Sequence, residues 1–186
     1  MNAYGIYLNS NESNSINNSS IHDMNYGISL STTKNNQITN TESYNNSAPG
    51  LYIGNLSENN TITNSQFYNN TDDGISIVQA SGTTFNNVQV FNNYLDGIHL
   101  VYYVYNTTIN NSQIYNNTNT VYNYQQDFGG IKVGQLNYSA YINSGIIINN
   151  TEIYNNNLYG IMAGDGTIGM KLNNVSIFNN AYGPGV

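Results

Sequence analysis

Several side chains that could do chemistry share a position relative to a glycine. Asp73 and Asp96 each stand directly before one, with Asp72 beside the first, and His99 and Lys132 each stand two residues after one. Paired carboxylates next to an imidazole are suited to general acid–base catalysis, and carboxylate oxygens are suited to Ca²⁺. These residues are far apart along the chain, so the chemistry depends on a fold that superposes their glycines. In the competing interpretation, Asp–Gly is an ordinary turn and His99 is a solvated surface residue.

Two longer connections supply a second candidate site, near residues 118–129 and 134–145. They are rich in Tyr, Asn and Gln, which offer a sugar flat apolar rings and amide partners. The predicted ligand-binding residues are Tyr122, Tyr124, Gln126, Asp127, Tyr138 and Tyr141. The alternative is that the two loops pack on each other and cover an exposed edge.

The elements that position these residues are internal repeats. A glycine followed by apolar residues on both sides of a variable one recurs seven times, at Gly5, Gly27, Gly50, Gly74, Gly97, Gly130 and Gly160. A second block lies between these glycines and reads Thr-Ile-Thr-Asn-Ser-Gln-Phe-Tyr-Asn-Asn at 61–70 and Thr-Ile-Asn-Asn-Ser-Gln-Ile-Tyr-Asn-Asn at 108–117. Such short alternation is typical of strands, and repeats of this length indicate a solenoid.

Each repeat predicts three short strands, which bury an apolar face only if successive repeats stack. Ile28, Leu51 and Ile75 would then lie over one another at ~4.8 Å, the spacing of paired strands. Each buried Ile or Leu contributes ~1.5–3 kcal/mol. The sequence therefore predicts an all-β, single-stranded parallel solenoid of about eight coils with three short strands per coil, as one domain over residues 1–186. In this fold Asp73 and Asp96 lie about 5 Å apart on adjacent coils.

Asn makes up 40 of the 186 residues and recurs where one strand must bend into the next. Asn tolerates positive φ better than other non-glycine residues, and stacked amides can hydrogen-bond from coil to coil. One predicted structural ladder, which begins at Asn18, continues through Asn40, Asn64, Asn87, Asn111, Asn150 and Asn174. A second consists of Asn46, Asn70, Asn93, Asn117, Asn156 and Asn180.

An outward aromatic column is also expected, because one repeat position is almost always a ring. Its members are Tyr44, Tyr68, Phe91, Tyr115, Tyr154 and Phe178. The column is either cross-strand packing that stabilises the sheet or a contact stripe for a neighbouring molecule.

Gly-Ile-x-Leu alternating with Ile-x-Asn-Asn resembles the right-handed parallel β-helix repeats of the pectate-lyase-like superfamily, and most of all those of NosD-type proteins. The resemblance runs from Gly5 to Gly183. It implies a right-handed β-helix and leaves the activity open, because this fold hosts lyases, hydrolases, epimerases, adhesins and spacers. The chain departs from the enzymes' patterns. It has no Arg, the usual base of pectate-lyase relatives, and no Asp-Pro-His, which alginate epimerase relatives carry.

Composition excludes several classes of function. The formal charge is −7 with only three Lys, which argues against nucleic acid as a partner. With no Cys, disulfides and zinc–thiolate sites are excluded. No apolar run approaches the ~18 residues of a membrane span. No cofactor is predicted, and the one metal considered is Ca²⁺ at the carboxylates.

Both ends of the chain read Asn-Ala-Tyr-Gly, inside a repeat. The chain is therefore either a piece of a longer β-helix or a subunit that associates end to end into filaments. We expect a non-catalytic structural module, outside the cell or on its surface, that contacts glycans, although no secretory signal is visible at the N-terminus. The alternative is a polysaccharide lyase, hydrolase or epimerase that acts around Asp73, Asp96 and His99.

Overall fold

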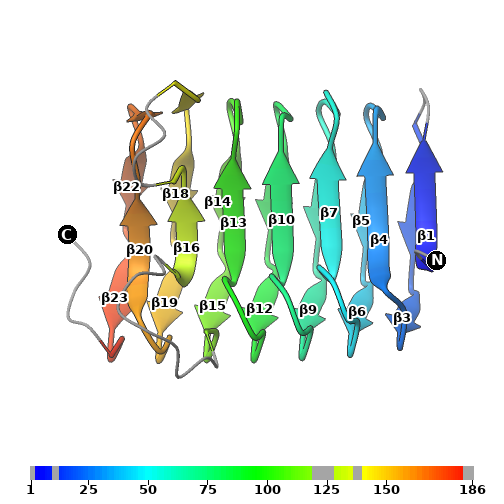
Figure 1. Cartoon of the computed structure of the whole chain (residues 1–186), viewed down its shortest axis with the longest axis horizontal. Helices are drawn as coiled ribbons and strands as arrows, with labels where there is room; N and C mark the ends of the chain where they lie inside the picture. The colour runs from blue at the N-terminus through cyan, green and yellow to red at the C-terminus, as the bar shows by residue number, and fades with distance from the viewer. Residues whose placement is uncertain (1–2, 10–12, 119–127, 136–139, 182–186) are drawn as a thin grey trace.

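The computed structural model describes residues 3–9, 13–118, 128–135 and 140–181. Within these ranges three parallel sheets of seven strands form a right-handed solenoid, and each coil adds one strand to each sheet (Figure 1). The predicted all-β, right-handed parallel β-helix with three strands per coil is confirmed. The described residues form seven coils, and the eighth coil of the prediction would begin near Gly183, outside the described residues. The described ranges hold no helix with the length and apolarity to cross a bilayer.

The strands that follow the repeat glycines form sheet A. They are β1 (Tyr4–Asn9), β4 (Tyr26–Ser31), β7 (Leu51–Gly54), β10 (Ile75–Val78), β13 (Ile98–Val101), β16 (Gly129–Val133) and β20 (Tyr159–Ala163). Sheet B consists of β2 (Ser15–Asn17), β5 (Gln37–Thr39), β8 (Thr61–Thr63), β11 (Thr84–Asn86), β14 (Thr108–Asn110), β18 (Ile147–Asn149) and β22 (Lys171–Asn173). Sheet C consists of β3 (Ser20–His22), β6 (Glu42–Tyr44), β9 (Gln66–Tyr68), β12 (Gln89–Phe91), β15 (Gln113–Tyr115), β19 (Glu152–Tyr154) and β23 (Ser176–Phe178). Two short strands, β17 (Asn143–Ser144) and β21 (Thr167–Ile168), form a separate pair.

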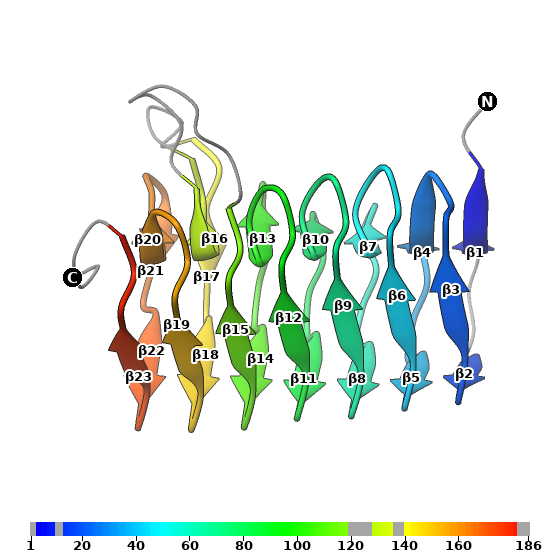
Figure 2. The same cartoon turned by 90° about the horizontal axis from the view of Figure 1, so that it is seen from below.

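Aliphatic residues stack in columns inside the coil, as the repeat predicted. Ile28 pairs with Leu51, which pairs with Ile75 in the next coil, and all three are fully buried. The columns merge into one hydrophobic cluster along the rod, enclosed by the three sheets (Figure 2). Because every coil buries its apolar face against its neighbours, stability is distributed along the rod and does not depend on one central core.

The repeat glycine is required by a close approach between neighbouring coils. At Gly97, a Cβ atom would lie 2.5 Å from the carbonyl oxygen of Gly130 and 2.6 Å from Cγ2 of Ile114. Both distances are below van der Waals contact. The repeat glycine therefore marks the corner where the turn from sheet C enters sheet A.

The two Asn ladders occupy different backbone conformations. The first follows sheet B with φ between 48° and 54°, at Asn18, Asn40, Asn64, Asn87, Asn111, Asn150 and Asn174. The prediction that the Asn46 ladder also takes positive φ is wrong. In that turn the positive φ falls one residue earlier, at Asn45, Asn69, Asn92, Asn116, Asn155 and Asn179. The left-handed residue turns the chain, and the next side chain then points inward, so Asn46 and Asn93 are fully buried.

Candidate functional site

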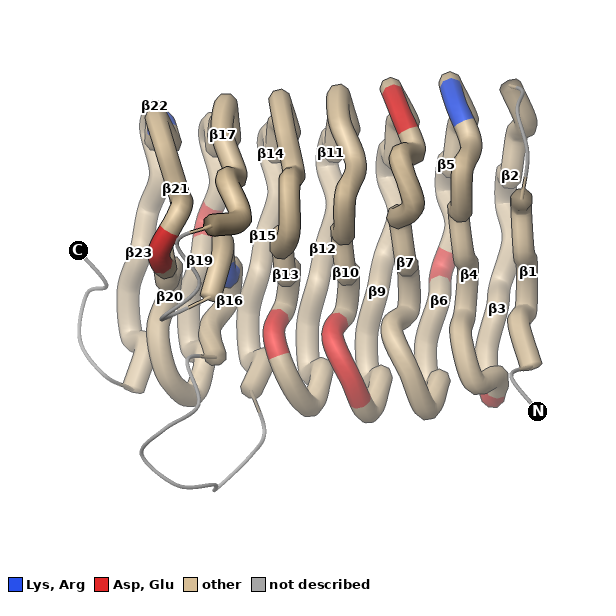
Figure 3. The backbone as a smooth tube through the Cα atoms, turned by 45° about the horizontal axis from the view of Figure 1, so that its top comes forward, with Lys and Arg blue, Asp and Glu red and all other residues tan. Residues whose placement is uncertain are grey.

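The acidic residues singled out from the repeat lie together at one corner of the solenoid. Asp73 and Asp96 occupy the turns before β10 and β13, and Figure 3 shows these turns on neighbouring coils. His99 lies in β13, where it pairs in register with Ser76 below and Lys132 above. The stacking of equivalent positions thus brings together residues from three coils, as the glycine offsets indicated.

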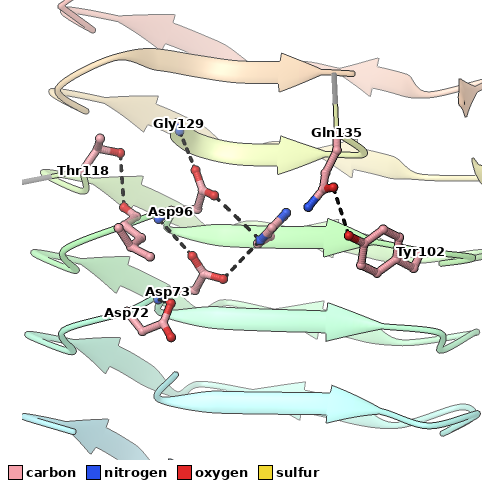
Figure 4. A network of polar contacts seen from close by, with 9 residues as sticks. Asp72, Asp73, Asp96, Tyr102, Thr118, Gly129 and Gln135 are labelled. Carbon is pink, nitrogen blue, oxygen red and sulfur yellow. Dashed lines mark hydrogen bonds and ion pairs between the residues drawn. The ribbon is translucent and has the colours of Figure 1, made fainter. Parts of the chain in front are cut away.

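The two carboxylates are oriented by the backbone of the coil above each of them (Figure 4). The Asp96 N–H donates to Oδ1 of Asp73 at 3.1 Å, and the Gly129 N–H donates to Oδ1 of Asp96 at 2.6 Å. The other oxygen of each carboxylate faces the same imidazole. Nδ1 of His99 lies 3.3 Å from Oδ2 of Asp73 and 3.9 Å from Oδ2 of Asp96. One oxygen of each acid therefore has a structural role, and the second is available for chemistry.

Burial perturbs the acids strongly. Asp96 is completely buried, and its desolvation, together with the negative charge of Asp73, holds its pKa well above the usual value of 3.8. Lys132 opposes that shift. The pKa of Asp72 is raised as well, first by burial and then by Asp73. Among the described residues, neither Oδ2 of Asp96 nor Nε2 of His99 has a hydrogen-bond partner.

The cluster offers little open surface. The side chain of His99 is 16% exposed and that of Asp73 is 7% exposed. Lys132 is also buried, with Nζ 5.4 Å from the centroid of the Phe128 ring. A polymeric substrate needs an open groove around its reacting bond, whereas an ion or a proton needs only a narrow opening. The geometry is thus better suited to a small ligand than to a polysaccharide chain.

The predicted ligand-binding loops are described only in part. Tyr122, Tyr124, Gln126, Asp127 and Tyr138 lie outside the described residues. Tyr141 packs edge-on against two rings of the preceding coil, Tyr102 at 4.7 Å and Tyr103 at 5.4 Å between centroids. The Tyr102 hydroxyl donates to Oε1 of Gln135 at 3.0 Å (Figure 4).

The first Asn ladder lies on the outer surface and makes amide contacts between coils. The Nδ2 of Asn40 donates to Asn18 at 3.2 Å, and that of Asn87 donates to Asn64 at 2.9 Å. Higher up, the Nδ2 groups of Asn150 and Asn174 donate to Asn111 and Asn150 at 3.3 and 3.0 Å. A neighbouring column that sequence reasoning missed does the same from within sheet B, where Asn110, Asn149 and Asn173 each donate to the Asn one coil below at 2.7–2.8 Å.

The second Asn ladder lies inside the coil and is continuous. From Asn46 through Asn70, Asn93, Asn117 and Asn156 to Asn180, each Nδ2 donates to the next Oδ1 at 2.9–3.1 Å. The same Oδ1 also accepts the backbone N–H of the Asn one coil earlier. For example, the N–H of Asn70 donates to Oδ1 of Asn93 at 3.1 Å. This ladder is structural, because it gives the buried polar groups of the turn their hydrogen-bond partners.

The expected aromatic column forms a continuous ring stack on sheet C. Its five Tyr and Phe pairs have centroids 4.8–5.0 Å apart and planes within 6° of parallel. His22, which the sequence reasoning did not include, extends the stack below Tyr44 at 4.9 Å. Its position in the third strand of the first coil is equivalent to that of Tyr44, and this equivalence would have identified it from the sequence. Because neighbouring rings cover each other's faces, the stack presents ring edges and hydroxyls to solvent.

The comparisons with known proteins agree with this geometry. A family model described as "right handed beta helix region" matches residues 4–135. Among solved structures, the chain is similar to pectate lyase Pel9A, with 23% identity and a TM-score of 0.69 over 82% of this chain and 40% of that one. It is similar to the periplasmic alginate epimerase AlgG, with 18% identity and a TM-score of 0.72 over 93% and 42%.

A third similar structure is the A-module of the Azotobacter vinelandii mannuronan C-5 epimerase AlgE4, with 17% identity and a TM-score of 0.64 over 97% of this chain and 56% of that one. At these identities the likeness shows the fold alone. The chain spans about two fifths of the first two structures and just over half of the third. No curated protein matches it.

Proposed function

This chain belongs to the family of right-handed β-helix regions, and on that premise we propose that it is a non-catalytic module that binds a neutral polysaccharide. The proposed binding surface is the outer face of sheets B and C. We place the module at the cell surface or outside the cell, where polysaccharides of this kind are found. The observation that carries the proposal is the array of polar columns on that face.

The array is most regular over three central coils. Each coil presents a Thr, a Thr or Asn, an Asn, a Gln and an aromatic ring, all at least partly exposed. These columns are Thr61–Thr84–Thr108, Thr63–Asn86–Asn110, Asn64–Asn87–Asn111, Gln66–Gln89–Gln113 and Tyr68–Phe91–Tyr115. Successive members are one coil apart, ~4.8 Å, which is comparable with the length of one pyranose ring in an extended chain.

The chemistry of the array suits hydroxyl groups. Within the ladder, the Asn87 amide uses one N–H on Asn64, and it keeps a second N–H for a ligand. The Thr, Gln and Tyr columns add both donors and acceptors. A polysaccharide whose sugar rings repeat with the coils could therefore make the same hydrogen bonds at each step.

Charge favours a neutral polysaccharide. The chain carries a formal charge of −7, and the three-coil array contains no cation. A polyuronide would be repelled, because like-charge repulsion opposes association over the whole surface. The names of the similar structures, a pectate lyase and alginate epimerases, support a polysaccharide as the general class of ligand.

End-to-end self-association is part of the proposal. In the seventh coil, the last that the structure describes, the residues Leu172 and Phe178 are 45% and 44% exposed, whereas equivalent residues in the central coils have a further coil over them and are buried or half-buried. A second copy stacked on this coil would pair with its strands and cover these side chains.

The polysaccharide proposal is tested by affinity electrophoresis against soluble glucan, mannan, galactan and xylan. The test variant carries Thr84→Ala, Gln89→Ala, Thr108→Ala and Gln113→Ala, and the control is Tyr7→Ser on sheet A. Each hydrogen bond lost is worth about 0.5–1.5 kcal/mol, so the variant should bind at least about tenfold more weakly. Unchanged retardation in the fourfold variant, or retardation by none of the neutral polymers, would refute the proposal.

A second candidate function is a polysaccharide lyase, hydrolase or epimerase. It is favoured by the convergence of Asp73, Asp96 and His99 on the outer side of sheet A. The test is incubation with pectate and with alginate, each with and without calcium. Ultraviolet absorbance detects unsaturated ends, and proton NMR detects epimerised residues. Activity that disappears in His99→Ala would establish the enzyme and overturn the non-catalytic proposal.

A further inference from the structure

We propose that Asp73, Asp96 and His99 form a binding site for a first-row divalent transition-metal ion, for which Zn²⁺ is the natural probe. The proposal stands apart from polysaccharide binding, since it concerns the corner where the turn from sheet C enters sheet A and uses none of the same residues. It rests on three observations: the placing of the donor atoms, an unpartnered buried oxygen, and the balance of charge.

The donor atoms are placed as metal ligands usually are. One carboxylate oxygen of Asp73, one of Asp96 and a ring nitrogen of His99 all lie within 4.8 Å of one another. In a tetrahedral zinc site with bonds of 2.0–2.2 Å, donor atoms are roughly 3.4 Å apart, so the 3.3 Å and 3.9 Å separations from His99 need only a small adjustment. Hydrogen bonds from Asp96 N–H and Gly129 N–H hold the other carboxylate oxygens, which fixes the direction of the free ones (Figure 4).

The second observation is Oδ2 of Asp96. The residue is fully buried, and in the described part of the chain this oxygen accepts no hydrogen bond. It faces Nδ1 of His99, but at 3.9 Å it lies beyond hydrogen-bond distance. An unpartnered buried carboxylate oxygen is costly, and a bound cation between it and the imidazole removes that cost.

The charge of the cluster also leaves room for a dication. Three acidic side chains, Asp72, Asp73 and Asp96, gather here with one basic side chain, Lys132. The excess of two acids over bases matches the charge of a divalent ion. The low exposure of His99, 16% of its side chain, admits an ion while it excludes a larger ligand.

The imidazole nitrogen of His99 determines which class of metal ion suits the site. Ca²⁺ and Mg²⁺ prefer oxygen ligands only, whereas imidazole together with carboxylates suits Zn²⁺, Mn²⁺ and Co²⁺. The ligands come from two adjacent coils, since Asp73 precedes β10 while Asp96 and His99 flank the start of β13. A bound ion would therefore join the fourth coil to the fifth.

The competing occupant is a proton, shared between His99 and the two carboxylates. Isothermal titration of the chelator-treated chain with Zn²⁺, repeated with Ca²⁺ and Mg²⁺, separates the two cases. We expect one Zn²⁺ per chain, bound more tightly than Ca²⁺ or Mg²⁺, and a visible Co²⁺ spectrum of low-symmetry four- or five-coordinate type. No Zn²⁺ binding, or tighter binding of Ca²⁺ than of Zn²⁺, would overturn the proposal.

Three ligand variants and one matched control complete the test. Asp96→Asn keeps the shape and the acceptor for Gly129, and Asp73→Asn and His99→Gln are similarly conservative. Each should weaken Zn²⁺ binding by more than about tenfold while the circular-dichroism spectrum stays that of a β-protein. The control is His22→Gln, because His22 and Asp23 form an exposed pair at 2.7 Å, and within the described ranges no third acid or His joins them in a metal-binding group. Zn²⁺ binding that survives in all three variants, or that is lost in His22→Gln, would place the ion elsewhere and refute this site.

Discussion

The interior Asn ladder provides a sharp test of what holds neighbouring coils together. In Asn93→Ala, Oδ1 disappears and two donors of Asn70 lose their acceptor, the backbone N–H at 3.1 Å and Nδ2 at 2.9 Å. The bonds from Nδ2 of Asn93 to Oδ1 of Asn117 and to the carbonyl of Phe67 are lost as well. Asn70 Nδ2 keeps only a long contact to the Ser43 carbonyl, at 3.4 Å.

The expected loss of stability follows from the groups left unpaired. Asn93 is fully buried, so water does not replace the lost partners. Each buried group without a partner costs about 1–3 kcal/mol, and one donor is orphaned completely while a second is weakened. We therefore expect the free energy of unfolding to fall by about 2–5 kcal/mol.

The matched control is Asn87→Gly, one strand earlier on the outer surface. Asn87 is exposed and has φ of 54°, and its amide bonds Asn64 at 2.9 Å. Glycine removes that bond but relieves the left-handed backbone strain, so the net change should lie within about 1 kcal/mol. Both variants are compared by urea unfolding followed by circular dichroism, with hydrogen exchange to detect opening of single coils. A loss below about 1 kcal/mol in Asn93→Ala, or an equal loss in Asn87→Gly, would refute the reasoning.

Three further predictions concern the corner glycine, the ring stack and the ends of the rod. Gly97→Ala should clearly lower the melting temperature, because its new Cβ would lie 2.5 Å from the Gly130 carbonyl oxygen and such overpacking costs about 1–3 kcal/mol. Gly169→Ala is the control: its methyl group enters open space, and only the φ of 65° makes alanine unfavourable, at a cost of about 1 kcal/mol. Equal melting temperatures would contradict this. Burial first, and then the Glu42 carboxylate at 3.3 Å, raise the pKa of Tyr68 above 10.0, so the folded state disfavours tyrosinate and loses stability as pH rises through that range. Glu42→Gln should lower the pKa of Tyr68 and reduce this alkaline loss, measured by ultraviolet absorbance of tyrosinate; an unchanged titration would show that Glu42 has no part in it. Light scattering of the 186-residue chain should show association that grows with concentration, and a strict monomer at the highest concentration would count against end-to-end stacking.

The repeat pattern predicted the superposition of equivalent residues because parallel coils leave little freedom of register. A slip of one residue would turn every inward aliphatic side chain outward. The pairing of Ile28 with Leu51, and of His99 with Lys132, follows directly from the offsets of these residues from their glycines. The proximity of Asp73 and Asp96 could be inferred in the same way.

The backbone conformation of the turns and the full membership of the ring stack were harder to predict from the sequence. The sequence reasoning assigned positive φ to the Asn46 ladder, whereas Asn45 takes it, because two adjacent Asn residues carry the same propensity. Packing decides which of the two takes the positive φ, because the Asn that follows the left-handed residue points its side chain into the interior. His22 escaped notice because its ring type differs from the Tyr and Phe that follow it in the stack.

The amino-acid sequence by itself determined the coil, the columns and the residues that share each column, since these depend only on strand periodicity and the spacing of glycine. The tertiary structure alone decided how the carboxylates are used. Two backbone N–H groups bind one oxygen each of Asp73 and Asp96, and the remaining oxygens converge on His99 in a nearly closed space. Burial and hydrogen-bond direction arise from the packing of three coils at once, and no single repeat contains that information.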